Sequence, residues 1–338
     1  MPLEAILPAS APASARLPAA WRLPLVQLSL AWIGLVALLW GEWRAMAHQW
    51  WDISTYNHIL LIPPILAWLV KLRAAELARL VPQAWWPGLV LLAGGLIAWL
   101  VGSAAGINLV SQLGAMVVLQ AAVVVLLGPR VAGALLFPLG YMAFMVPFGD
   151  ELIPALQAIT ARLAVALTHA SGVPAQIDGV FIDTPAGLFV VAEACSGVKF
   201  LIAMVALGAL VAHTCFASAR RRAAFMAAAV IVPVLANGVR AWGTIYIAQS
   251  QGIEFAAGFD HIVYGWIFFA LVMTAVLGAA WRFFDRSPDD PPIDAAAIAA
   301  SPRLARLARF GIGGWTATAT ILALAGAVAW LDPIARLP

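Results

Sequence analysis

The stretch EACSGVKFLIAMVALGALVAHTCF, residues 193–216, decides the fold class of this chain. From Ser196 onward it is almost wholly apolar, and a helix of that length reaches about 30 Å, the thickness of a bilayer's hydrocarbon core. Similar segments recur along the chain, in which 64% of residues are hydrophobic and 10% charged. A soluble domain is about half apolar and a quarter charged. Lipid supplies no water to open backbone groups, so we predict an all-α polytopic membrane protein.

Apolar segments extend this pattern on both sides of residues 193–216. We expect an eight-helix core followed by one C-terminal transmembrane helix. The second segment carries Pro63 and Pro64, so we expect it to be broken or extended into its flanks. The predicted spans are 24–41, 58–70, 86–104, 109–127, 131–148, 196–216, 223–243, 261–281 and 312–331.

The predicted spans divide the chain into four regions. An Ala/Pro-rich stretch precedes the first span, and a polar stretch that contains SPDDPP precedes the last. The regions are a disordered cytoplasmic tail (1–22), a membrane core (23–284), a cytoplasmic linker (285–311) and an extra transmembrane helix with a short tail (312–338).

Positive charge is distributed asymmetrically about the spans. Most of the 19 lysines and arginines, including the Arg220–Arg222 triplet, fall on one side. Cytoplasmic loops carry such an excess, so we predict a cytoplasmic N-terminus and place Cys195 at the outer face. Cations that flank spans also explain the net charge of +3. We expect no nucleic-acid partner, because the sequence holds no basic, aromatic-bearing soluble domain.

The longest insertion between predicted spans, residues 149–195, lies on the outer side. Its first part, DELIPALQAITARLAVALTH, places leucines on one helical face, as in an interfacial helix. DGVFID and GLFVVA then flank TPAG, whose Pro and Gly suit a tight turn. We therefore predict a small interfacial helix and a β-hairpin that leads directly to Cys195.

The two cysteines lie at opposite ends of one predicted span. Cys195 and Cys215 are about 30 Å apart along a helix, whereas a disulfide needs Cα atoms within about 7 Å. We expect Cys215 to be inert on the reducing side. At a helix start, unpaired N–H groups and the helix dipole lower a thiol pKa and favour the reactive thiolate. The alternative for Cys195, beside Ser196 and Gly197, is a small packing residue at the interface.

Two further polar residues share the predicted depth of Cys195. Arg240 lies near the outer end of the seventh span, and His261 begins the eighth. Arginine in a membrane helix costs a few kcal/mol and usually has a partner or a function, although it can also snorkel to phosphate. Asn237 shares the face of Arg240, and Asp260 could orient His261.

Cysteine, histidine and arginine at one depth suffice for acyl transfer. A thiolate attacks a carbonyl, histidine moves the proton, and a guanidinium stabilises the oxyanion. The sequence holds no His/Cys/acid cluster with metal-ligand spacing and no phosphate-binding glycine motif in a suitable context. We therefore expect neither a metal nor a cofactor.

Three blocks of the sequence resemble those of the exosortase/archaeosortase family, most closely its bacterial type A. They are EACSGVKFLIA, PVLANGVRAWG and DHIVYGWIFF, in this order and each at the outer end of a span. The resemblance implies that Cys195 is the nucleophile, His261 the proton shuttle and Arg240 the transition-state stabiliser. It assigns supporting roles to Asn237, Asp260, Ser196 and Tyr264.

The resemblance also implies a reaction in the bacterial inner membrane, with the site at the periplasmic face. Substrates would be secreted proteins with a C-terminal Pro-Glu-Pro signal, a membrane helix and a basic tail. A thioacyl-enzyme would form and pass to an envelope glycolipid or polysaccharide. Lys199 stands where arginine is more usual. Candidate substrate-binding residues are Lys199, Arg44, Arg162, His58 and Glu193.

Two other functions remain open from the sequence. Several spans with polar residues near one face could form a transporter or flippase for envelope polymer precursors, with Arg240 holding a phosphate. Against this, the sequence shows no obvious internal repeat. A membrane acyltransferase could instead use Cys195 as its acyl carrier.

Overall fold

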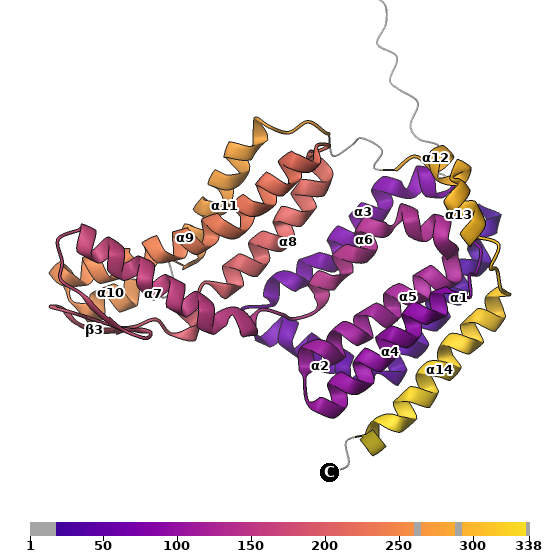
Figure 1. Ribbon diagram of the computed structural model, residues 1–338, viewed down its shortest axis with the longest axis horizontal. Helices are drawn as coiled ribbons and strands as arrows, with labels where there is room; N and C mark the ends of the chain where they lie inside the picture. The colour runs from indigo at the N-terminus through magenta and orange to yellow at the C-terminus, as the bar shows by residue number, and fades with distance from the viewer. Residues whose placement is uncertain (1–17, 260–264, 288–292, 336–338) are drawn as a thin grey trace, which may run out of the picture.

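A computed structural model describes residues 18–259, 265–287 and 293–335 of the chain (Figure 1). Among these residues, eight helices are long and apolar enough to cross a membrane. The described residues also form one small antiparallel sheet of three strands. The predicted all-α polytopic membrane fold is confirmed, and the chain is a multi-pass membrane protein.

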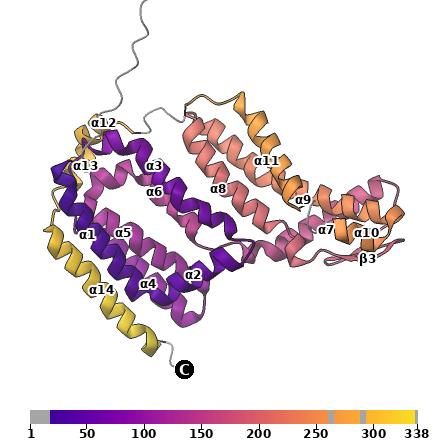
Figure 2. The same ribbon diagram turned by 180° about the vertical axis from the view of Figure 1, so that it is seen from behind.

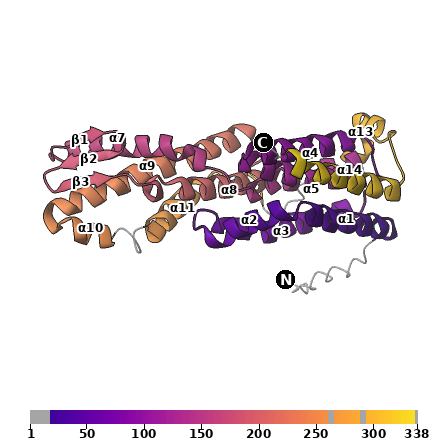
Figure 3. The same ribbon diagram turned by 90° about the horizontal axis from the view of Figure 1, so that it is seen from below.

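The helices form two lobes along the long axis of the molecule, and Figure 3 shows the sheet at one end and α1 and α14 at the other. The first lobe is built on the α4–α5 hairpin, whose helices touch where Gly102 meets Ser111 and Gly114 meets Trp99. α14 packs against α1 and α4 (Figure 2). The elements are α1 (Ala19–Leu38), α2 (Trp40–Asp52), η1 (Asn57–Leu61), α3 (Ile62–Leu77), α4 (Gly88–Ala105), α5 (Asn108–Ala134), α6 (Leu136–Tyr141), η2 (Met142–Met145), α12 (Ala295–Ala300), α13 (Pro302–Leu307) and α14 (Gly314–Ala335).

The second lobe holds the first two of the predicted blocks and the described part of the third, residues 265–269. Helices α8, α9 and α11 run side by side, and α7 packs along α9, where Gly238 admits the side chain of Leu163 (Figure 1). The lobe comprises η3 (Asp150–Leu152), α7 (Ile153–Ala170), β1 (Gln176–Asp178), β2 (Phe181–Thr184), β3 (Gly187–Val190), η4 (Glu193–Cys195), α8 (Val198–Cys215), α9 (Ala219–Gln251), α10 (Ile253–Phe259) and α11 (Gly265–Trp281).

The sheet has the order β1-β2-β3, and β2 and β3 form the predicted hairpin around TPAG. β1 adds a third strand that the sequence analysis did not predict. Side chains from both neighbouring helices hold the sheet: Gln157 Nε2 donates to the Val191 carbonyl at 2.7 Å, and Gln249 Nε2 donates to Thr184 Oγ1 at 3.2 Å. The sheet is thereby tied to α7 and α9 immediately before Cys195.

Several boundaries differ from the predicted spans. Residues 131–148 do not form one helix: α5 ends at Ala134, the short α6 ends at Tyr141, and the 3-10 turn η2 follows. Gly128, with φ 80°, and Pro129 interrupt α5 at the predicted boundary between the fourth and fifth spans. The second span extends to Leu77 and the seventh to Gln251. Helix α2 lacks a long apolar run and was not predicted. α7, predicted as an interfacial helix, is also long and apolar enough to be a candidate span.

Candidate active site

Cys195 lies on a tight turn that precedes α8. It is the last residue of η4, and its side chain is half-buried. Gly197 then caps α8 with φ 83°, a left-handed conformation that glycine adopts without steric cost. The thiol therefore lies just ahead of the first α-helical residue, Val198, and the helix begins two residues after the predicted start of the span at Ser196.

Asn237 on α9 holds this turn in place. Its Nδ2 donates to the carbonyl oxygen of Cys195 at 2.9 Å and to Thr160 Oγ1 on α7 at 3.0 Å. Asn237 is buried, and a Cβ at Gly197 would approach its Cγ to 2.7 Å. The Cys-Ser-Gly and Asn-x-x-Arg blocks thus interlock through the Asn237 amide and the space that Gly197 leaves open.

Arg240 follows Asn237 by one helical turn and faces the same cavity as Cys195. This cavity has a volume of about 90 Å³. Its other walls are mostly apolar and come from the sheet, the segment after β3 and the C-terminal part of α9: Ile182, Phe189, Val190, Val191, Ala241, Thr244 and Ile245. A thiol and a guanidinium therefore share a small, largely apolar pocket, where charge interactions are stronger than in water.

Lys199 adds a second cation to this region. It lies in the first turn of α8, within electrostatic range of Arg240 and Cys195, and its Nζ is 5.1 Å from the ring centroid of Phe200. A larger cavity of about 490 Å³ adjoins η4 and is lined by Lys199, Glu193 and Asp150. Burial and a hydrogen bond to Asp150 raise the pKa of the nearby Tyr56 phenol above its ordinary value.

The remaining predicted residues take other positions. Ser196 is buried, and its Oγ accepts from the Val198 N–H at 3.3 Å, so it stabilises the turn. His58 Nδ1 lies 3.1 Å from the Thr55 carbonyl oxygen. Arg44 on α2 and Arg162 on α7 are exposed, and neither lines a cavity that contains Cys195 or Lys199.

His261, Asp260 and Tyr264 lie outside the described residues. Of the described elements on either side of them, α10 contacts the hairpin turn and α11 reaches the site. Ile253 of α10 lies against the hairpin turn at Gly187. Phe268 and Phe269 of α11 line a small cavity together with Asn237 and Arg240.

Thr160 and Gln157 support the site and were not predicted. Both lie on α7, and their polar side chains face the turn and the sheet rather than the lipid. The only feature of the sequence that could have indicated their role is that they are polar residues within an otherwise apolar helix. Within the described ranges, no group of three or more His, Cys, Asp or Glu side chains gathers closely enough to hold a metal ion.

Residues 50–278 match the family model described as transmembrane exosortase (Exosortase_EpsH). The matched region begins in α2 and ends in α11, so it includes η4, α8 and α9 with the whole Cys195 cavity. No curated protein and no solved structure matches the chain.

Proposed function

The chain belongs to the transmembrane exosortase family, and on this premise we propose that it is a membrane cysteine transpeptidase with Cys195 as its nucleophile. The observation that carries the proposal is the common cavity of Cys195 and Arg240, in which Asn237 fixes the backbone of the cysteine. A nucleophile held in one position loses less entropy on reaching the transition state.

The proposed reaction has two steps. The Cys195 thiolate attacks the scissile carbonyl carbon, the guanidinium of Arg240 stabilises the oxyanion, and His261 gives a proton to the departing amine. A thioester then joins Cys195 to the N-terminal part of the substrate. The amine of an envelope glycolipid or polysaccharide attacks this thioester and loses its proton to His261, and the sulfur leaves as the thiolate, which restores the starting state.

We further propose that the substrate is a secreted protein with a C-terminal Pro-Glu-Pro signal and a membrane helix. The Cys195 end of α8 would face the periplasm and the Cys215 end the cytoplasm. Among the candidate cations, Lys199 is best situated to pair with the glutamate of the signal, because it lies within electrostatic range of both Cys195 and Arg240 and lines the cavity next to η4. Lys199→Glu should impair processing of Pro-Glu-Pro and be partly rescued by Pro-Lys-Pro.

The test is to co-express the chain with a tagged sorting-signal substrate and follow its size by gel. Wild type should yield a shortened substrate, and Cys195→Ala should yield none, a loss of at least about 10³-fold. Cys215→Ala is the matched control, because this buried thiol lies at the other end of the same helix. Normal processing by Cys195→Ala would refute the thiol mechanism.

A further inference from the structure

A second cavity lies at the Cys215 end of α8, away from the proposed active site. It has a volume of about 480 Å³, and its polar residues are Arg73 from α3, His213 from α8 and Tyr141 from α6. The rest of its wall is apolar or glycine: Gly133, Ala134, Leu136, Phe137, Gly140, Phe144 and Ile293.

Arg73 is the central feature of this cavity. Only 1% of the residue is exposed, although a guanidinium stays charged in proteins. Its Nη1 donates to the Leu69 carbonyl at 2.7 Å, and its Nη2 lies 2.7 Å from His213 Nε2. Arginine can only donate, so His213 Nε2 accepts. The buried Nε of Arg73 has no hydrogen-bond partner.

The cavity is built around these two residues. The His213 ring stacks on Phe137 with centroids 3.6 Å apart and planes 3° from parallel, so the acceptor nitrogen is held in one orientation. Arg286 Nη1 donates to the His213 carbonyl at 3.4 Å, and Arg222 also lies within electrostatic range of the imidazole. Arg73, Arg222 and Arg286 thus concentrate positive charge beside one cavity.

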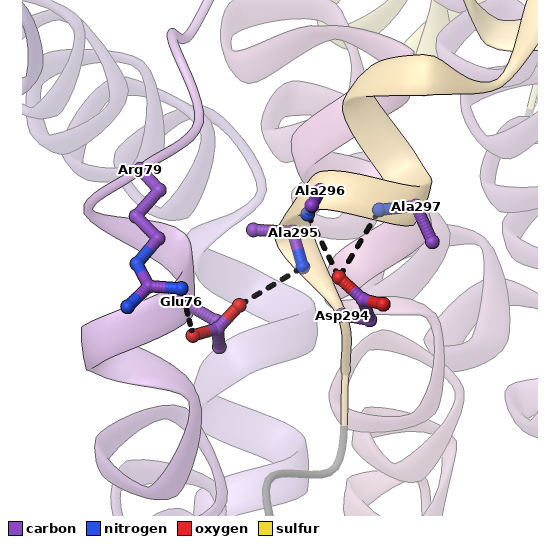
Figure 4. A network of polar contacts seen from close by, with 6 residues as sticks. All are labelled: Glu76, Arg79, Asp294, Ala295, Ala296 and Ala297. Atoms are coloured by element: carbon purple, nitrogen blue, oxygen red, sulfur yellow. Dashed lines mark hydrogen bonds and ion pairs between the residues drawn. The ribbon is translucent and has the colours of Figure 1, made fainter.

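The three described carboxylates near this cavity are paired with groups other than Arg73. Glu76 pairs with Arg79 at 2.9 Å and accepts from the Ala295 N–H at 3.0 Å (Figure 4). Asp294 caps α12 by accepting from the N–H groups of Ala296 and Ala297 (Figure 4).

The third of these carboxylates, Asp285, accepts from the Ala217 N–H and pairs with Arg221 at 3.2 Å. No described carboxylate therefore forms an ion pair with Arg73. A buried guanidinium with an unsatisfied N–H is a strong site for an external oxyanion.

The walls indicate which oxyanion. Leu136, on the α6 side of the cavity, is 73% exposed, and Gly140 one turn later is exposed as well. A soluble phosphate would gain nothing from this apolar, lipid-accessible wall, whereas a phospholipid places its phosphate and its chains in these two environments together. We propose that the cavity binds an anionic phospholipid, with the phosphate on Arg73 and an acyl chain along α6.

The test uses the full chain purified in a neutral detergent and phosphatidylglycerol as the probe, with retained lipid counted by native mass spectrometry. Wild type should retain phosphatidylglycerol, and Arg73→Gln should retain at least about tenfold less. Arg79→Gln is the control, because this arginine lies near the same end of α3 and is exposed. Equal retention by Arg73→Gln and wild type would overturn the proposal.

A second pair of variants at one position avoids any dependence on Arg73 for folding. A Cβ at Gly140 meets nothing within 4 Å, so a side chain fits there. Gly140→Asp should place a carboxylate at the cavity and abolish retention, whereas Gly140→Ala should leave it intact. Equal retention by these two variants would contradict the proposed site.

Two further measurements distinguish a phospholipid from a soluble phosphate as the bound oxyanion. Phosphatidylcholine should not be retained, and millimolar inorganic phosphate should neither compete with phosphatidylglycerol nor raise the melting temperature. Stabilisation by inorganic phosphate equal to that by the lipid would identify a soluble anion and overturn the lipid assignment.

Asp289 and Asp290 precede Ile293 and lie outside the described residues. Retention seen only in the Asp289→Asn/Asp290→Asn variant would show that the chain itself fills the cavity.

Discussion

The two ends of α8 each combine a cavity with an arginine from a neighbouring helix, yet they are suited to different tasks. At the Cys195 end, Arg240 shares about 90 Å³ with a thiol whose backbone is held by Asn237. At the other end, Arg73 shares about 480 Å³ with His213 and an exposed apolar wall. In the two proposals, the membrane arginine serves chemistry where a thiol is fixed beside it, and binding where an exposed apolar wall adjoins it.

The largest effect expected from a change at an arginine concerns Arg240. Arg240→Gln should lower the rate of substrate processing by about 10²- to 10³-fold, because it removes the charge that stabilises the oxyanion. Initial rates with a tagged substrate measure this effect. Phosphatidylglycerol retention should not change.

Arg220→Gln provides the control for Arg240→Gln, since Arg220 lies exposed at the opposite end of α9. It should process substrate at the wild-type rate. An unchanged rate in Arg240→Gln would remove the distinction between the two ends of α8.

A smaller loss is expected when the support of the nucleophile is removed. Asn237→Ala leaves the Cys195 carbonyl and the Thr160 hydroxyl without their hydrogen-bond donor. This should lower the free energy of unfolding by about 1–3 kcal/mol. A displaced thiol should lower the processing rate by about 10- to 100-fold. Leu235→Ala, on the same helix and half exposed, is the control. A wild-type rate for Asn237→Ala would show that the amide does not position the cysteine.

Stability should respond to the turn between Cys195 and α8. Gly197→Ala forces an alanine to adopt φ 83° and brings its Cβ against the Asn237 side chain. The free energy of unfolding should fall by about 2 kcal/mol or more. We expect the melting temperature in detergent to fall by at least about 3 °C. Gly94→Ala, in the middle of α4 with open space around its Cβ position, should not lower it. Equal melting temperatures for the two variants would contradict the interlocked turn.

The smallest effect is a pH dependence at the Cys215 end. The Ala217 N–H and Arg221 lower the pKa of Asp285 below the ordinary value of 3.8. A carboxylate of this kind stabilises the fold above the ordinary pKa, and its contribution disappears as the pH falls through the folded-state pKa. Asp285→Asn should therefore melt slightly below wild type at pH 6. The difference should close as the pH falls below about 4, and a constant difference would exclude this titration.

Most of the long apolar helices and the shared level of Cys195 and Arg240 could be predicted from local features. Span lengths and the distribution of cations were enough to bring Cys195 and Arg240 to the same level. The contacts that organise both cavities could not be predicted, because each joins distant parts of the chain. The hydrogen bond between Asn237 and Cys195 spans 42 residues, and that between Arg73 and His213 spans 140.

Helix interruptions were predicted only in part. The predicted boundary between spans 109–127 and 131–148 coincides with Gly128 and Pro129, where α5 is interrupted. The ends of α5 at Ala134 and of α6 at Tyr141 were missed, because they lie inside an apolar stretch whose hydropathy alone suggests continuity. β1 was missed because a strand of three residues, Gln176–Asp178, has no alternation of its own and depends on pairing with β2.

The central claim is that Cys195 carries the substrate as a thioester, and intact-protein mass spectrometry tests it directly. The chain is incubated with a sorting-signal substrate in the absence of an acceptor amine, and the modified peptide is mapped with and without hydroxylamine. We predict an adduct with the mass of the N-terminal substrate fragment on Cys195, released by hydroxylamine and absent from Cys195→Ala. Processed substrate without any adduct, or an adduct that persists in Cys195→Ala, would contradict the account.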